Sequence, residues 1–207
     1  MKRLNKTLLI YIFGLSVSWL FSNSLYAQDV QQAFKSSYTA ENNKDYATAI
    51  SALKRAYNNS YEMNLRLGWL HYLEGKYQES ISYYNKCILQ MPMSIEAKLG
   101  YVQPAYALEK WNDVLLQYLA ILRIDPNHAK ANYQAGVAYY YRKDYTRAEK
   151  YLQKVLNLYP FDYYSLLILG WTKYNLGKRN EAKVLFNKVL LYAPDDTSAK
   201  EGLGLIR

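Results

Sequence analysis

Four of the five prolines in this chain of 207 residues stand at a constant interval of 34 residues. An interval of this length is typical of proteins built from one repeated pair of secondary-structure elements. Four consecutive segments of the sequence align in this register, and each ends in one of the prolines Pro92, Pro126, Pro160 and Pro194. The period therefore predicts a tandem repeat.

The pattern inside each segment predicts two amphipathic helices. Apolar residues recur at three- and four-residue spacings in both halves, and the closing proline disfavours helical geometry in the residue before it. Gly75 and Gly177 follow a first helix, where a left-handed residue ends it at low cost. Ser94, Asp162 and Asp196 precede a first helix and can cap its free amides. One such pair cannot bury its apolar face alone, so several must stack.

The residues shared by the segments carry a family resemblance. The first helices share the pairs Leu67 and Gly68, Ala135 and Gly136, and Leu169 and Gly170. The second helices open on Tyr46, Tyr77, Trp111 and Tyr145, followed by the small residues Ala49, Ser80, Ala148 and Ala182. A larger residue stands four places further on, at Leu53, Tyr84, Tyr118, Leu152 and Phe186. This pattern resembles the tetratricopeptide repeat.

The resemblance implies an all-α fold, a right-handed solenoid of antiparallel helix pairs over residues 28–207. The repeats are expected at about residues 30–60, 61–94, 95–128, 129–162 and 163–196, with a capping helix at 197–207. We also expect each glycine of the first helix to face the small residue of the second. The third repeat departs from the pattern, with Val102, Val114 and an internal Pro104. We expect a kink or a widened helix pair there.

The first 27 residues have the order of a secretory signal peptide. Three basic charges precede an apolar run of 15 residues, Thr7 to Phe21, and Ala27 is the expected cleavage residue. The run is short against the roughly 20 residues of a spanning helix. A retained N-terminal anchor is the alternative. In either case we expect the rest of the chain to be exported, in the periplasm or associated with the cell envelope.

The family resemblance implies that the first helices line a concave groove that holds a peptide or a segment of another protein. The groove positions in this sequence are occupied by Leu65, Trp69, Tyr72, Gln103, Tyr106, Tyr133, Val137, Tyr140, Tyr141, Tyr164, Leu167, Trp171 and Tyr174. Trp and Tyr are rigid, present large contact areas and are common in binding hot spots. The tyrosines at 72, 106, 140 and 174 could instead pack between repeats.

Other partners are compatible with parts of the sequence. Residues 129–194 carry eleven basic and four acidic side chains, which form either a solvated face or a surface for anionic lipid or an acidic protein. Trp69 and Trp171 could stack on a glycan. Nucleic acid fits poorly, since the aromatic residues and the charges lie in different places.

The sequence contains no pattern that indicates catalysis. His71 and His128 lack neighbours at metal-ligand spacing, and the single Cys87 is expected to be a buried thiol. We expect no metal, no cofactor and no enzymatic activity. The sequence therefore predicts an exported scaffold for protein–protein interaction in cell-envelope assembly or maintenance. The alternatives are a membrane-anchored component of an envelope complex and a glycan-binding module.

Overall fold

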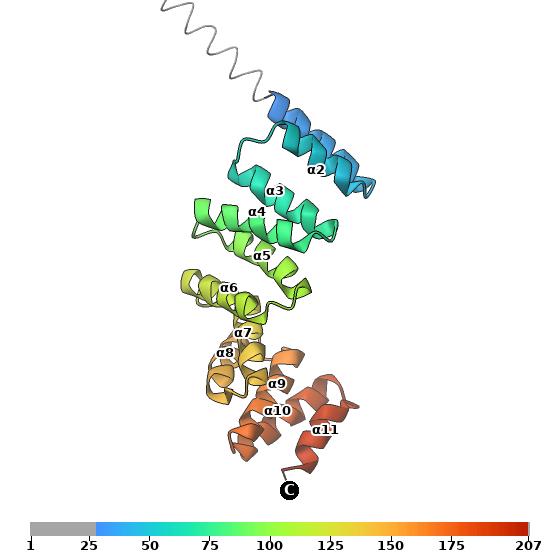
Figure 1. The fold of residues 1–207 in the computed structure, drawn as a ribbon. Helices are drawn as coiled ribbons and strands as arrows, with labels where there is room; N and C mark the ends of the chain where they lie inside the picture. The colour runs from blue at the N-terminus through green and yellow to red at the C-terminus, as the bar shows by residue number, and fades with distance from the viewer. Residues whose placement is uncertain (1–27, 207) are drawn as a thin grey trace, which may run out of the picture. The chain divides into compact units, whose positions relative to one another are not determined.

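The computed structural model describes residues 28–206, and every regular element within them is a helix (Figure 1). The expected signal peptide, residues 1–27, lies outside the described residues. The chain divides into two compact units, of which the first ends at Pro92 and the second begins at Met93. The predicted fold class, all-α with successive helix pairs, is confirmed in each unit.

The first unit contains a helix over residues 28–42, followed by α2 (Tyr46–Arg55), α3 (Tyr61–Leu73) and α4 (Tyr77–Gln90). Helix α3 packs against both α2 and α4. The core of this unit joins small and branched apolar residues from its first three helices: Ala33, Ala40, Ala49, Ile50, Leu53, Leu67 and Leu70.

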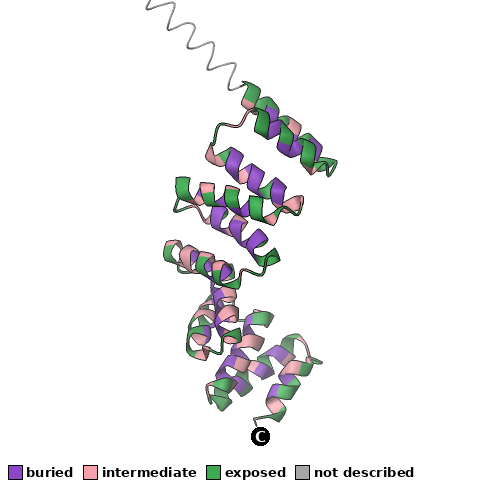
Figure 2. Cartoon of the chain, viewed as in Figure 1, coloured by how far each residue is buried: buried purple, intermediate pink, exposed green. Residues whose placement is uncertain are grey.

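The second unit contains three helix pairs and one further helix. These are α5 (Ile95–Ala107), α6 (Trp111–Ile124), α7 (Ala129–Tyr141), α8 (Tyr145–Leu158), α9 (Tyr163–Asn175), α10 (Arg179–Tyr192) and α11 (Thr197–Gly204). Each helix packs on the next along the chain. The first helices α7 and α9 are contacted on both sides, and buried residues line them in Figure 2. This double contact explains why α9 is apolar nearly all round.

The predicted caps and turn residues are found where expected. Ser94 Oγ accepts a hydrogen bond from the amide of Ala97, and the carboxylate of Asp162 accepts one from Ser165. Gly75 and Gly177 have φ of 79° and 75°. In other repeats the same left-handed position is held by Lys44, Glu109 and Lys143, with φ of 58°, 55° and 60°. The turn after the first helix therefore requires this backbone geometry whether or not a glycine supplies it.

The glycines of the first helices allow close approach mainly to the large residue of the second helix. A Cβ atom on Gly136 would lie 2.6 Å from Cγ of Leu152, and one on Gly170 would lie 2.7 Å from Cε1 of Phe186. The expected small partner is also near in the second repeat, where Ser80 Oγ donates to the carbonyl of Gly68 over 2.7 Å.

Pro104 does not interrupt the helix that contains it. Helix α5 extends to Ala107, and the carbonyl of Pro104 accepts the amide of Leu108 at 3.1 Å. The proline lies in the last turn, where only one intrahelical bond, to the carbonyl of Gly100, is lost. Across residues 28–206 no helix combines the length and the apolar character that crossing a bilayer would need.

Candidate functional site

All thirteen predicted groove residues lie on first helices, namely α3, α5, α7 and α9, and none of them is fully buried. Five are exposed: Trp69, Gln103, Tyr106, Tyr141 and Tyr164. The other eight are partly buried: Leu65, Tyr72, Tyr133, Val137, Tyr140, Leu167, Trp171 and Tyr174. The first helices thus present side chains with free surface at every position that the family resemblance indicated.

The four tyrosines at intervals of 34 residues also pack inside their own repeats. In three repeats the partner is the aromatic residue that opens the second helix, with ring centroids 4.8 to 5.9 Å apart in Tyr72–Tyr77, Tyr106–Trp111 and Tyr140–Tyr145. In the last repeat that position holds Arg179, and Tyr174 packs on Trp171 at 5.7 Å. Tyr72, Tyr106 and Tyr140 therefore help to join the two helices of a pair, whereas the contact of Tyr174 lies within α9.

Trp69 and Trp171 each use the indole nitrogen in a hydrogen bond. Trp69 Nε1 donates to Glu41 Oε1 at 2.7 Å in the first unit. Trp171 Nε1 donates to Ser198 Oγ at 2.8 Å, and its ring lies 5.1 Å from that of Phe186. Trp171 thus links α9 to α10 and α11. Sequence reasoning missed this role because Ser198 lies beyond the last complete repeat.

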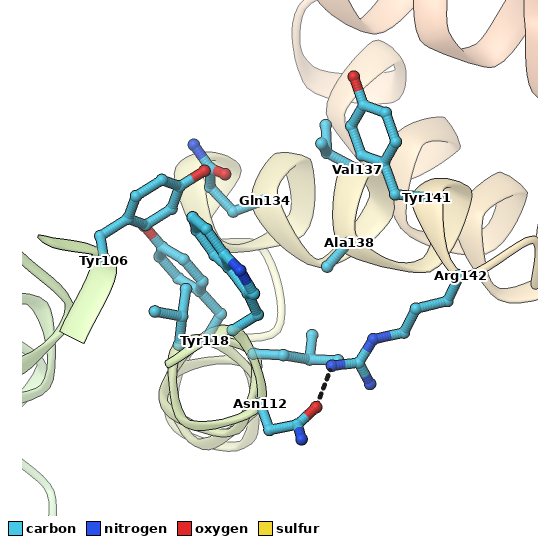
Figure 3. A pocket seen from close by; sticks show the side chains of 11 residues that line it. Tyr106, Asn112, Tyr118, Gln134, Val137, Ala138, Tyr141 and Arg142 are labelled. Carbon is cyan, nitrogen blue, oxygen red and sulfur yellow. Dashed lines mark hydrogen bonds between the residues drawn. The ribbon is translucent and has the colours of Figure 1, made fainter. Parts of the chain in front are cut away.

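A pocket of about 510 Å³ opens among α5, α6 and α7 (Figure 3). It brings together three of the predicted groove residues, Tyr106, Val137 and Tyr141. The remaining lining residues were not anticipated: Trp111, Asn112, Val114, Leu115, Tyr118, Gln134, Ala138 and Arg142. Most of them belong to the second helix α6. The family's groove positions describe first helices only, so this wall could be found only from the packed structure.

The walls of this pocket are aromatic and aliphatic. Tyr106 is 48% exposed, and its ring meets Trp111 edge to face, with centroids 4.8 Å apart. Figure 3 shows Tyr106 on one side and Val137 and Tyr141 on the other. Tyr118 is almost fully buried, and burial, with a smaller effect from Tyr106, raises its pKa to about 12. Its phenol is therefore neutral at physiological pH.

One edge of the pocket is cationic. Arg142 is the only charged residue of the lining, and its Nη2 donates to Asn112 Oδ1 at 2.7 Å (Figure 3). A guanidinium has five N–H donors in a planar fork, so one bond to an amide leaves others available to a carboxylate. The pocket is thus suited to an apolar group that carries or adjoins a negative charge.

A smaller pocket of about 310 Å³ brings together two further predicted residues, Tyr133 and Tyr164, with Lys130 and Asp162 among its lining. Burial raises the pKa of Tyr133, and the Asp162 carboxylate raises it further. The other predicted residues of the second unit, Gln103, Tyr140, Leu167, Trp171 and Tyr174, line neither pocket.

The two histidines and the cysteine, which are residue types common in catalytic and metal sites, are buried or cap a helix in this structure. His71 is buried and stacks on Tyr83 with ring centroids 5.3 Å apart, and burial lowers its pKa. His128 caps α7 through Nδ1, and Cys87 is buried in α4. No group of three or more His, Cys, Asp or Glu that could hold a metal ion occurs among residues 28–206.

Helix pairs of 13 and 14 residues, joined by short turns and stacked along the chain, define a helical-repeat protein. Family models described as tetratricopeptide repeat match residues 34–88, 129–162 and 164–196, which together make up more than half of the chain. The chain belongs to the tetratricopeptide repeat family.

Several known proteins are similar to this chain. The BBSome complex member BBS4 of Mus musculus is 23% identical over 65% of this chain. The matched region makes up only 26% of the length of that relative. A tetratricopeptide repeat protein from Parabacteroides merdae has a TM-score of 0.72 and 22% identity, covering 86% of this chain and 72% of its own. YrrB, described as having an unusual peptide-binding site, has a TM-score of 0.68 at 13% identity, covering 85% and 96%. These structural likenesses concern the fold.

Proposed function

We propose that this protein is an exported scaffold that holds a segment of another cell-envelope protein against its first helices. A repeat fold of this kind supports protein–protein interaction and typically serves as a non-enzymatic scaffold. The observation that carries the proposal is the pocket among α5, α6 and α7, because it combines exposed aromatic residues with one cationic edge. Rigid aromatic side chains in a pocket are frequent anchors of protein interfaces.

Two of the similar proteins support this proposal, because both contact other polypeptides. YrrB is described as a tetratricopeptide repeat protein with a peptide-binding site, and BBS4 as a member of a complex. Both descriptions involve contact with another polypeptide. We extend that class of partner, a protein or peptide, to this chain.

Export and a place in cell-envelope assembly or maintenance rest on the first 27 residues of the sequence. Intact-mass measurement of the native protein tests this part of the proposal. A mass lower by the 27 residues supports a cleaved signal. An undiminished mass would favour the second candidate, a membrane-anchored component of an envelope complex, because the apolar run from Thr7 to Phe21 would then be retained.

Crosslinked co-purification from the native envelope tests the binding site. We would compare the wild type with a Tyr106→Ala, Tyr141→Ala variant, since both side chains are exposed and line the pocket. A Leu116→Ala, Leu191→Ala variant is the matched control, because these side chains are exposed on second helices and lie outside the pocket. A protein lost only from the tyrosine variant would be the partner. Identical proteins in all three samples would contradict the proposed site.

A further inference from the structure

We propose that the pocket among α5, α6 and α7 receives a flat aromatic side chain of the partner, with a carboxylate beside it. This inference rests on the proposed function and deepens it, because it specifies the chemistry of the bound segment. It follows from a comparison of the third repeat with the fifth, both of which lie in the second unit.

The fifth repeat shows how a tryptophan of the chain can cover the corresponding surface. Its Trp171 ring packs on Phe186, with centroids 5.1 Å apart and the planes at 67°. The same ring lies 5.7 Å from Tyr174, one helical turn further along α9. A tryptophan of the chain itself thus occupies the surface between the first helix and the second.

The third repeat lacks that tryptophan. Two periods earlier in the sequence, Gln103 stands in the place of Trp171, Tyr118 in the place of Phe186 and Tyr106 in the place of Tyr174. Gln103 is exposed and does not line the pocket, whereas Tyr106 and Tyr118 both do. Tyr118 is only 2% exposed, so the aromatic surface that lacks a covering indole is the ring of Tyr106, which is 48% exposed.

The shape and chemistry of the walls favour an aromatic occupant over an aliphatic one. Tyr106 and Trp111 are held edge to face at 86°, so they present one ring face and one ring edge. Aromatic rings prefer offset or edge-to-face neighbours of this kind. The volume of about 510 Å³ lies within the usual range for small-molecule sites, so an indole or phenol can enter.

Charge complementarity specifies what stands next to that ring. Arg142 lies at the edge of the pocket with one guanidinium bond to Asn112, and the exposed Lys143 follows it in the chain. Residues 129–194, which include the α7 wall of the pocket, have seven more basic than acidic side chains. A carboxylate adjoining the bound ring would pair with Arg142, and a cationic neighbour would be repelled.

The test uses two small probes, N-acetyltryptophan and its neutral amide, titrated into the isotope-labelled full chain and followed by NMR chemical shifts. N-acetyltryptophan is expected to shift the signals of pocket residues, and to bind about threefold more tightly than the amide, as for an exposed ion pair. Arg142→Gln should remove this preference. Gln103→Trp should abolish binding, because the chain's own indole would then pack on Tyr106 as Trp171 packs on Tyr174. Gln103→Ala, the matched control, should leave binding unchanged.

Unfolding measurements would first establish that the three variants fold as the wild type does. Absence of pocket shifts in the wild type, or binding that persists in Gln103→Trp, would overturn the aromatic occupant. Equal binding of acid and amide would overturn the carboxylate. The envelope co-purification experiment is independent of these probes, because it reports capture of a whole protein. Capture that depends on Tyr106 and Tyr141 without probe binding would therefore reject this inference and leave the scaffold proposal intact.

Discussion

The ammonium nitrogen of Lys173, on α9, lies 2.6 Å from a carboxylate oxygen of Glu149, on α8. Lys173 is only 7% exposed, and it also contacts the carboxylate of Glu181 on α10. Lys178 approaches the same Glu149 at 2.7 Å. A buried cation is costly unless it is paired. The pairing of Lys173 with Glu149 therefore holds the fourth helix pair, α7 and α8, against the fifth, α9 and α10.

This ion pair predicts an acid-sensitive contribution to stability. Burial raises the pKa of Glu149, but hydrogen bonds from Lys173 and Lys178 outweigh it, so the pKa lies below its ordinary value of 4.5. A lowered carboxyl pKa means that the contribution is complete above the ordinary value and is lost as the pH falls through the folded value. At pH 7, Glu149→Gln should lower the free energy of unfolding by about 1–3 kcal/mol.

Urea unfolding of both proteins between pH 7 and pH 3 checks this prediction. The difference between wild type and Glu149→Gln should narrow below the ordinary carboxyl pKa. Glu201→Gln, at an exposed position on α11, is the control and should change stability by no more than about 0.5 kcal/mol. A difference that stays constant with pH would show that the carboxylate charge is not responsible.

Leu152 lies so close to Gly136 that a single added methyl group at this position is predicted to destabilise the protein. Gly136→Ala would place a Cβ 2.6 Å from Cγ of the fully buried Leu152 and 3.3 Å from its backbone nitrogen. Overpacking of this kind costs about 1–3 kcal/mol and exceeds the gain of about 1 kcal/mol from helix propensity. Thermal unfolding should show the loss. Gly204→Ala meets nothing within 4 Å and should be neutral or slightly stabilising.

Phe186 is predicted to be the most sensitive apolar residue of the C-terminal repeats. It is fully buried, lies against Gly170 and Gly202, and packs against the ring of Trp171. Phe186→Ala should cost about 3–5 kcal/mol by leaving a cavity. It should also make α11 more susceptible to limited proteolysis, because Gly202 belongs to that helix. Leu191→Ala, at a side chain 76% exposed on the same helix as Phe186, should leave both measurements nearly unchanged.

Asp162 caps α9, so replacing it by Ala and by Asn is predicted to lower the stability of the protein by different amounts. The Asp162 carboxylate accepts the amide of Ser165 at 2.9 Å. Asp162→Ala leaves this amide without its partner and should cost about 1 kcal/mol, whereas Asp162→Asn retains an acceptor and should cost much less. Chemical denaturation measures both. Equal losses would mean that the charge of Asp162, rather than its cap, stabilises the protein.

The local structure of the described residues could be predicted closely from the sequence. The prolines, the turn glycines and the caps act on backbone within a few residues of themselves, so their positions in the chain are enough to place helix ends. Helix α5 continues through Pro104 to Ala107, and the kink or widened helix pair expected there stays a prediction. A proline in the last turn removes one hydrogen bond, and the buried surroundings keep the helix continuous.

The candidate site was predictable only in part. The family resemblance indicated Tyr106, Val137 and Tyr141, which do line one pocket. It did not indicate Trp111, Tyr118 or Arg142. Whether the thirteen groove residues bind a partner stays a prediction.

The sequence by itself determined the repeat, its period and the helices, because these depend on residue types at short and regular spacings. Only the tertiary structure decided which side chains meet. Trp171 is held by Phe186 and Ser198, whereas with Gln103 at the equivalent position the ring of Tyr106 stays 48% exposed at a pocket. The physical reason is that an aromatic side chain becomes a core residue or a binding surface according to its neighbours on the adjacent helices, and packing sets those neighbours.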